Sequence, residues 1–259
     1  MPKSPGDGLP VAGQLLFARY AYPPNMLGYC GSDDHQALLE YGSAGIVDGG
    51  LRELTAAFEG ALPYLRMIAS AGRITDPFAA PVVHSYWVGS ALLDRVDPRT
   101  AASFLTEDFV GRAGSSRDVV MQALDQGGLP HHSFHVLCAS PWARMLGRGG
   151  DDAVLRVLDR CRIRSGTILD TEDEAVVVES RPLRWDGRWL RLGEPAQERA
   201  RWRSGGYGFL PRPRRGDLVS LHWEWICDRL SRTAAGALHR YTALSISVAN
   251  QLNAAKLPA

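Results

Sequence analysis

Two short stretches in the second half of the chain decide its fold. Residues 161–169 read CRIRSGTIL, and residues 216–222 read GDLVSLH. Both are rich in β-branched and aliphatic residues over the length of one strand, as is EAVVVESRPL at residues 174–183. Between them, the pair Asp186-Gly187 is flanked by Trp185 and Trp189, which is the signal of a tight hairpin. The sequence therefore predicts a β unit from residue 161 onward.

The segments on either side of this β unit read as helical. From Trp223 the apolar period becomes helical, and residues 234–252 are expected to form a C-terminal helix. The glycine-rich stretch 146–150 is the best linker, which puts a boundary within residues 147–160. We therefore expect an α+β fold with a mainly helical domain over residues 1–150 and a β domain with a final helix over residues 151–259.

Apolar spacing and capping signals divide the first 125 residues into several helices. The first, over residues 10–20, is expected to stop at the sequence YPPN of residues 22–25. Later helices are predicted over residues 51–70, 76–96, 97–112 and 115–125, and one more is predicted to begin after a cap at Ser32 or Asp33. Residues 131–139 read as a strand or an extended linker, and residues 151–160 as a short helix.

Composition argues against several classes of protein. The 29 basic and 28 acidic side chains give a formal net charge of +1, so no overall field attracts nucleic acid or a membrane surface. The four cysteines are scattered without a CxxC pair, which excludes a zinc ribbon and a thioredoxin motif. Neither a signal peptide nor an apolar stretch of 18 residues is present, so we expect a cytoplasmic protein with reduced thiols.

The spacing within the two deciding stretches carries a resemblance. Cys161 is followed five residues later by Gly166, and Gly216-Asp217 is followed by His222 six residues after the glycine. An aromatic residue, apolar residues, a charged pair and a leucine follow, at residues 225–230. This order is similar to that of the HypC/HybG/HupF family of [NiFe]-hydrogenase maturation chaperones, over about residues 161–252.

The resemblance implies a small OB-like β-barrel followed by a C-terminal helix, and it implies a role. In that family the Cys and the His bind the iron of an Fe(CN)2CO fragment together with HypD. Carried over, Cys161 is the thiolate ligand and His222 the second ligand, and the partner is a hydrogenase large-subunit precursor or a HypD-like protein. A soft thiolate with an imidazole suits low-spin iron. In the family the Cys is N-terminal, whereas Cys161 is internal and follows Arg160. A buried apolar thiol is the alternative role for Cys161.

A second group of candidate ligands lies in the first half. His131 and His135 share one face if residues 131–139 form a strand, and His84 is a donor for a third ligand. Together they are a candidate metal site, with hydrogen-bonded histidines packed at an interdomain seam as the alternative. A pure interaction module, in which all these motifs are structural, also stays open.

The segment around Cys30 suggests an enzymatic alternative. Residues 22–31 read YPPNMLGYCG, a pattern similar to that of an uncharacterised actinobacterial family associated with hydrogenase genes. Cys30 precedes a predicted helix N-terminus, where the dipole lowers a thiol pKa, so a transferase or hydrolase using Cys30 and a histidine base is conceivable. The sequence contains no phosphate loop, HExxH or GxSxG motif.

Overall fold

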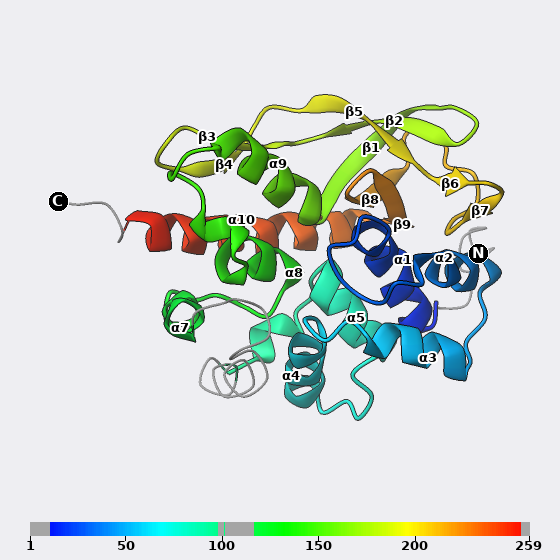
Figure 1. Ribbon diagram of the computed structural model, residues 1–259, viewed down its shortest axis with the longest axis horizontal. Helices are drawn as coiled ribbons and strands as arrows, with labels where there is room; N and C mark the ends of the chain where they lie inside the picture. The colour runs from blue at the N-terminus through cyan, green and yellow to red at the C-terminus, as the bar shows by residue number, and fades with distance from the viewer. Residues whose placement is uncertain (1–10, 98–100, 102–116, 255–259) are drawn as a thin grey trace, which may run out of the picture.

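The computed structural model describes residues 11–97, 101 and 117–254 of the chain. The described residues up to Cys161 form helices and the loops that connect them (Figure 1). The helices are α1 (Gly13–Met26), α2 (His35–Ala44), α3 (Gly49–Ala56), α4 (Leu62–Gly72), α5 (Ala80–Trp87), η1 (Leu93–Arg95), α7 (Arg117–Asp125), α8 (His132–Phe134), the π-helical η2 (His135–Ala139), η3 (Trp142–Arg144) and α9 (Asp151–Cys161). Strands begin directly after α9, as the sequence predicts.

Five strands form one mixed sheet, in the order β1-β2-β5-β9-β8, and β8 pairs back with β1. The pairs are antiparallel except for one parallel bridge between β5 and β9. The strands are β1 (Arg164–Thr171), β2 (Ala175–Ser180), β5 (Ala196–Arg201), β8 (Leu218–His222) and β9 (Trp225–Arg229), with the hairpins β3 (Leu183–Trp185)–β4 (Leu190–Leu192) and β6 (Arg203–Ser204)–β7 (Tyr207–Gly208) beside them. The predicted Asp186-Gly187 turn joins β3 to β4.

The long helix α10 (Arg232–Ala254) runs between the strands and the N-terminal helices (Figure 1). One large buried cluster includes Phe17 of α1, Trp225 of β9 and Leu238 of α10, while a smaller cluster fills the inside of the sheet. The large core therefore continues across the boundary predicted near residue 150. The expected α+β class, with a helical first part and a helix at the end, is confirmed.

Several predicted helix boundaries were wrong. Helix α1 does not stop at residues 22–25 but runs through Pro23 and Pro24. A proline in the last turns of a helix removes a hydrogen bond without stopping the chain from keeping a helical φ. The helix predicted over residues 51–70 is two helices, α3 and α4, which are separated by a turn at residues 57–61. Pro63 lies in the first turn of α4, where a proline is favoured because no helical partner is needed for its missing N–H. The one predicted over 76–96 is α5 followed by η1.

The end of the chain also differs from its prediction, since residues 225–229 form β9 rather than a helix. Trp225 and Ile226 pair with His222 and Leu221 across a tight turn, so tertiary pairing overrides the apparent helical period. The helix predicted over residues 97–112 lies mostly outside the described residues, and so do Ser115 and Ser116, where the next was predicted to begin.

The segment 131–139 was predicted to be extended, and this was wrong as well. It is helical, as α8 and η2, and it packs against α10. Cys138 donates a hydrogen bond to the carbonyl of Ser245, and the hydroxyls of Ser133 and Thr242 lie 3.2 Å apart. These contacts with α10 stabilise the helical conformation of α8 and η2, which the local sequence does not predict.

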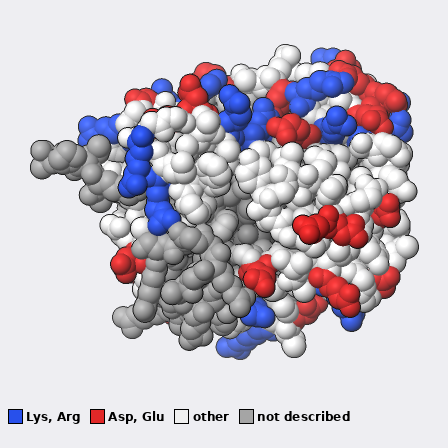
Figure 2. Space-filling model, viewed as in Figure 1, with Lys and Arg blue, Asp and Glu red and all other residues white. Residues whose placement is uncertain are grey.

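Charges of both signs are mixed over the strands, and the described surface below them carries fewer charges on the face seen in Figure 2. This distribution agrees with the near-zero formal charge. Among the described helices there is none with both the length and the apolar character needed to cross a bilayer.

Candidate metal centre

His222, the last residue of β8, is anchored to helix α1. Its Nδ1–H donates a hydrogen bond of 2.6 Å to the backbone carbonyl of Tyr20, and the Tyr20 hydroxyl lies 2.7 Å from that of Ser220. Pro24, four residues after Tyr20, has no N–H to offer this carbonyl. The proline inside α1 therefore leaves a backbone acceptor that orients the imidazole.

The other ring nitrogen of His222, Nε2, forms no hydrogen bond with the described residues. With Nδ1 protonated, Nε2 carries the lone pair, and it has no hydrogen-bond partner among the described residues although the side chain is fully buried. Burial lowers the pKa of His222 to about 3, although the Cys161 backbone lies close enough to raise it slightly, so the ring is neutral at neutral pH. A neutral imidazole fixed through one nitrogen to a carbonyl is the usual arrangement of a metal-ligating histidine.

Cys161 completes the predicted pair. It is the last residue of α9, and the ligand atoms of Cys161, His222 and His132 all lie within 4.8 Å of one another. Burial raises the pKa of the Cys161 thiol to about 12. The thiol is therefore protonated at neutral pH, and a metal ion must displace its proton to bind. The structure thus brings together the two residues that the family resemblance implied.

His132 is a third candidate ligand that the sequence analysis missed. Its Nε2–H donates to the carbonyl of Cys161 at 2.9 Å, and its Nδ1 lies 3.2 Å from the hydroxyl of Tyr86. Burial, followed by the nearby His222, lowers its pKa well below the usual value. Both nitrogens are engaged, so one must exchange its partner before His132 can bind a metal. The only signal for it in the sequence was the density of histidines at residues 131–135.

A buried ion pair joins the two chain segments that carry Cys161 and His222. Arg164 of β1, 1% exposed, contacts both carboxylate oxygens of Glu198 at 3.2 and 3.0 Å, and donates to the carbonyl of Trp223 at 2.6 Å. Glu198 also accepts from Arg160 and from Ser180. Arg160 precedes Cys161 and Trp223 follows His222. The network therefore holds the backbone next to each of these two candidate ligands in place.

The turn after His222 is held in an uncommon conformation. Trp223 has a φ of 51°, which is rare for a bulky residue and costs conformational energy. Its N–H donates to the carbonyl of Arg160 at 2.8 Å, and its ring stacks on Tyr29 with centroids 4.5 Å apart. These contacts compensate the strain and close the β8–β9 turn against the end of α9.

The three candidate ligands face a cavity of about 430 Å³. Its wall also includes Cys30, Tyr86, Trp87 and Phe58. The space is far larger than a metal ion, and its lining is largely apolar. Cys161 and His222 would hold a metal at the wall of this cavity, which has room for ligands from outside the chain.

Cys30 does not stand directly before a helix N-terminus, where the sequence analysis expected it. Helix α2 begins at His35 with Asp34 as its N-cap, so Cys30 lies five residues before the helix. Burial of the thiol in the cavity wall raises its pKa to about 12, although the residue as a whole is exposed. The Asn25 amide holds the Cys30 carbonyl at 2.7 Å. A protonated thiol gives no support to the transferase or hydrolase alternative.

The second predicted group of ligands is not brought together. His131 caps α8, accepting from the Ser133 N–H, and its ring stacks on Tyr241. His135 lies 3.2 Å from the Tyr64 hydroxyl, and His84 stands in the last turn of α5. Within the described part of the chain, the group around Cys161 is the one that gathers three ligand atoms of this kind.

A family model matches residues 10–256, and its description is a family of unknown function, DUF6390. The chain belongs to this family. The DUF6390 match includes both the helical part and the strands, and with them Cys161, His222 and His132. No curated protein and no solved structure shows significant similarity to the chain.

Proposed function

We propose that this protein holds a transition-metal centre through Cys161 and His222, with His132 as a third ligand. The observation that carries the proposal is the unpartnered Nε2 of the fully buried His222, within 4.8 Å of the other two ligand atoms. A buried polar nitrogen without a partner costs free energy, and a bound metal removes that cost.

We further propose that the cargo is an iron fragment delivered during maturation of a [NiFe] hydrogenase. The resemblance of the two motifs to HypC-type chaperones supports this role, with the five strands as the OB-like barrel of that family. A thiolate with neutral imidazoles suits low-spin iron. The apolar cavity provides room for small ligands on the iron that do not come from the protein.

The partner in this proposal is a hydrogenase large-subunit precursor or a HypD-like protein. A partner that takes the cargo must reach Cys161, which is only half-buried. Tyr29 and Trp142 line the cavity and are both substantially exposed, so they are the aromatic side chains placed to contact it.

Metal binding is tested first with Co²⁺ on the reduced full-length protein. We expect a thiolate-to-cobalt charge-transfer band at one equivalent, lost in Cys161→Ser and in His222→Ala. Cys138→Ala is the matched control, because the Cys138 thiol donates to the Ser245 carbonyl and does not line the cavity. Absence of the band, or its loss in the control alone, contradicts the metal centre.

The iron cargo is tested separately. The protein is purified without oxygen from cells that also produce the maturation partners, and infrared spectra are recorded. We expect CN and CO stretching bands that disappear in Cys161→Ser. Cobalt binding without these bands would retain the metal centre and reject the iron fragment.

A further inference from the structure

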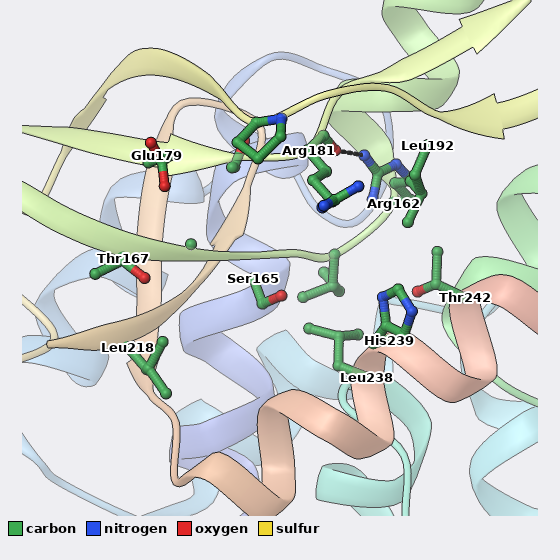
Figure 3. A pocket seen from close by; sticks show the side chains of 14 residues that line it. Arg162, Ser165, Thr167, Glu179, Arg181, Leu192, Leu218, Leu238, His239 and Thr242 are labelled. Carbon is green, nitrogen blue, oxygen red and sulfur yellow. Dashed lines mark hydrogen bonds between the residues drawn. The ribbon is translucent and has the colours of Figure 1, made fainter. Parts of the chain in front are cut away.

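A second cavity, of about 240 Å³, lies between β1, the end of β2 and helix α10 (Figure 3). Its most polar part is lined by two arginines, a histidine and hydroxyl groups: Arg162, Arg181, His239, Ser165 and Thr242. None of these side chains lines the cavity of the candidate metal centre. Figure 3 shows the guanidinium groups of Arg162 and Arg181 turned toward the same space, above Ser165 and His239.

Arg162 is a buried cation, and one of its guanidinium nitrogens has no hydrogen-bond acceptor among the described residues. Its side chain is 3% exposed, and Nε and Nη2 both donate to one carboxylate oxygen of Asp159, at 3.1 and 2.7 Å. Nη2 also donates to the Arg181 carbonyl at 2.6 Å. Nη1 has no acceptor among the described residues. A guanidinium group prefers to use its donors in pairs on planar oxyanions, so the free Nη1 favours an acceptor from outside the chain.

Arg181 adds a second guanidinium with free donors. It makes a single long hydrogen bond from Nη1 to the Gly193 carbonyl at 3.4 Å. The carboxylate that lines the cavity, Glu179, pairs across the strands with Thr167, at the end away from the two guanidinium groups in Figure 3. The positive end therefore has no carboxylate of its own facing the cavity. The Ser165 hydroxyl has no partner within the described structure and is a further donor.

We propose that this cavity binds a small oxyanion, a carboxylate or phosphate group held by Arg162, Arg181, His239 and Ser165. The small volume fits one such group with a few attached atoms rather than a nucleotide. The site does not depend on the proposed metal, because none of the candidate metal ligands lines it. Arg162 directly follows Cys161, so the two sites are neighbours along the chain.

The test measures binding of inorganic phosphate and of succinate by calorimetry, at constant ionic strength set with chloride. The protein is first passed over a chelating resin, so that metal plays no part. We expect saturable binding of at least one anion, weakened about tenfold in Arg181→Gln and severalfold in His239→Gln. Preference between the two anions assigns the ligand as a phosphate or a carboxylate.

Two controls separate this site from other causes. Arg191→Gln removes an exposed arginine that pairs with Asp186 outside the cavity, and it should leave anion binding unchanged. Cys161→Ser should also leave it unchanged, which keeps the result independent of the metal proposal. No saturable binding of either anion, or equal weakening in Arg191→Gln, overturns the proposal. Arg181 and His239 are exposed, so their variants are expected to fold.

Discussion

The Nδ1 atom of His222 lies 2.6 Å from the carbonyl oxygen of Tyr20, a residue 202 positions earlier in the chain. This contact decides the tautomer of His222, because a carbonyl can only accept. It thereby turns the lone pair of Nε2 toward the space shared with Cys161. The helical half of the chain thus orients a side chain that the strands supply.

Replacing Pro24 by Ala is expected to weaken metal binding about tenfold. This is the lower end of the effect seen when a metal-binding side chain loses the hydrogen-bond partner that orients it. The new N–H competes with His222 for the Tyr20 carbonyl, four residues before it. Pro23→Ala is the matched control, since its N–H reaches the Arg19 carbonyl instead. Cobalt titration measures both variants, and equal affinities would contradict this role for Pro24.

Removing the Tyr86 hydroxyl should strengthen metal binding. In Tyr86→Phe the Nδ1 of His132 loses its hydrogen-bond donor and becomes free to bind the metal. A hydrogen bond with a net value of about 1 kcal/mol corresponds to roughly a fivefold gain in affinity. Tyr64→Phe is the control, because that hydroxyl contacts His135 instead. A weaker affinity in Tyr86→Phe would show that His132 does not bind through Nδ1.

Metal affinity should rise with pH at a slope of one proton. The pKa of the Cys161 thiol is raised to about 12 and that of His222 is lowered to about 3. Between pH 6 and 8 the thiol alone must lose a proton, so the apparent association constant rises about tenfold per pH unit. Cobalt titrations at several pH values measure the slope. About a hundredfold rise per unit would indicate that Cys30 also binds as a thiolate.

Acid should destabilise the metal-free protein before its carboxylates titrate. Burial lowers the pKa of His131 and His222 to about 3 and of His135 to about 4, against about 6.5 in the unfolded chain. The unfolded state therefore binds more protons below pH 6.5, and the free energy of unfolding falls as pH drops. Urea titrations should show that the free energy of unfolding changes less steeply with pH in His135→Gln than in the unsubstituted protein, and equal pH dependence would contradict this origin.

Loss of the buried guanidinium behind the site should destabilise the fold. Arg164→Met leaves Glu198 and the Trp223 carbonyl without their buried donor, which costs about 3–5 kcal/mol. Urea unfolding measures this, with the exposed Arg191→Met as control. The double variant Arg164→Met, Glu198→Leu should recover part of the loss, because it leaves no buried carboxylate unpaired. A loss below 1 kcal/mol in the single variant would contradict the structural role.

The sequence predicted the strands from local patterns, whereas the meeting of Cys161 with His222 was implied by the resemblance to HypC-type chaperones. β-branched runs and an Asp-Gly turn are readable from neighbouring residues. It did not predict His132, since an extended segment would place His132 on the face opposite His131 and His135. The helix observed there is selected by contacts with α10, more than 100 residues later.

The role of Pro24 was unpredictable for a similar reason. A proline pair is a sound signal for the end of a helix, and the cost of continuing is one missing hydrogen bond per proline. Here the acceptor left without its helical donor is used by a histidine from a distant strand. Only the tertiary structure shows that the missing bond has been replaced.

The contact between Tyr20 and His222 joins two residues that are synthesised at different times. At about 5–20 residues per second, the ribosome needs roughly 10 to 40 s to make the 202 residues that separate them. The Tyr20 carbonyl is therefore made well before its imidazole partner, and the hydrogen bond between them can form only once β8 has been synthesised. In the proposed metal centre, metal binding would accordingly follow the synthesis of β8.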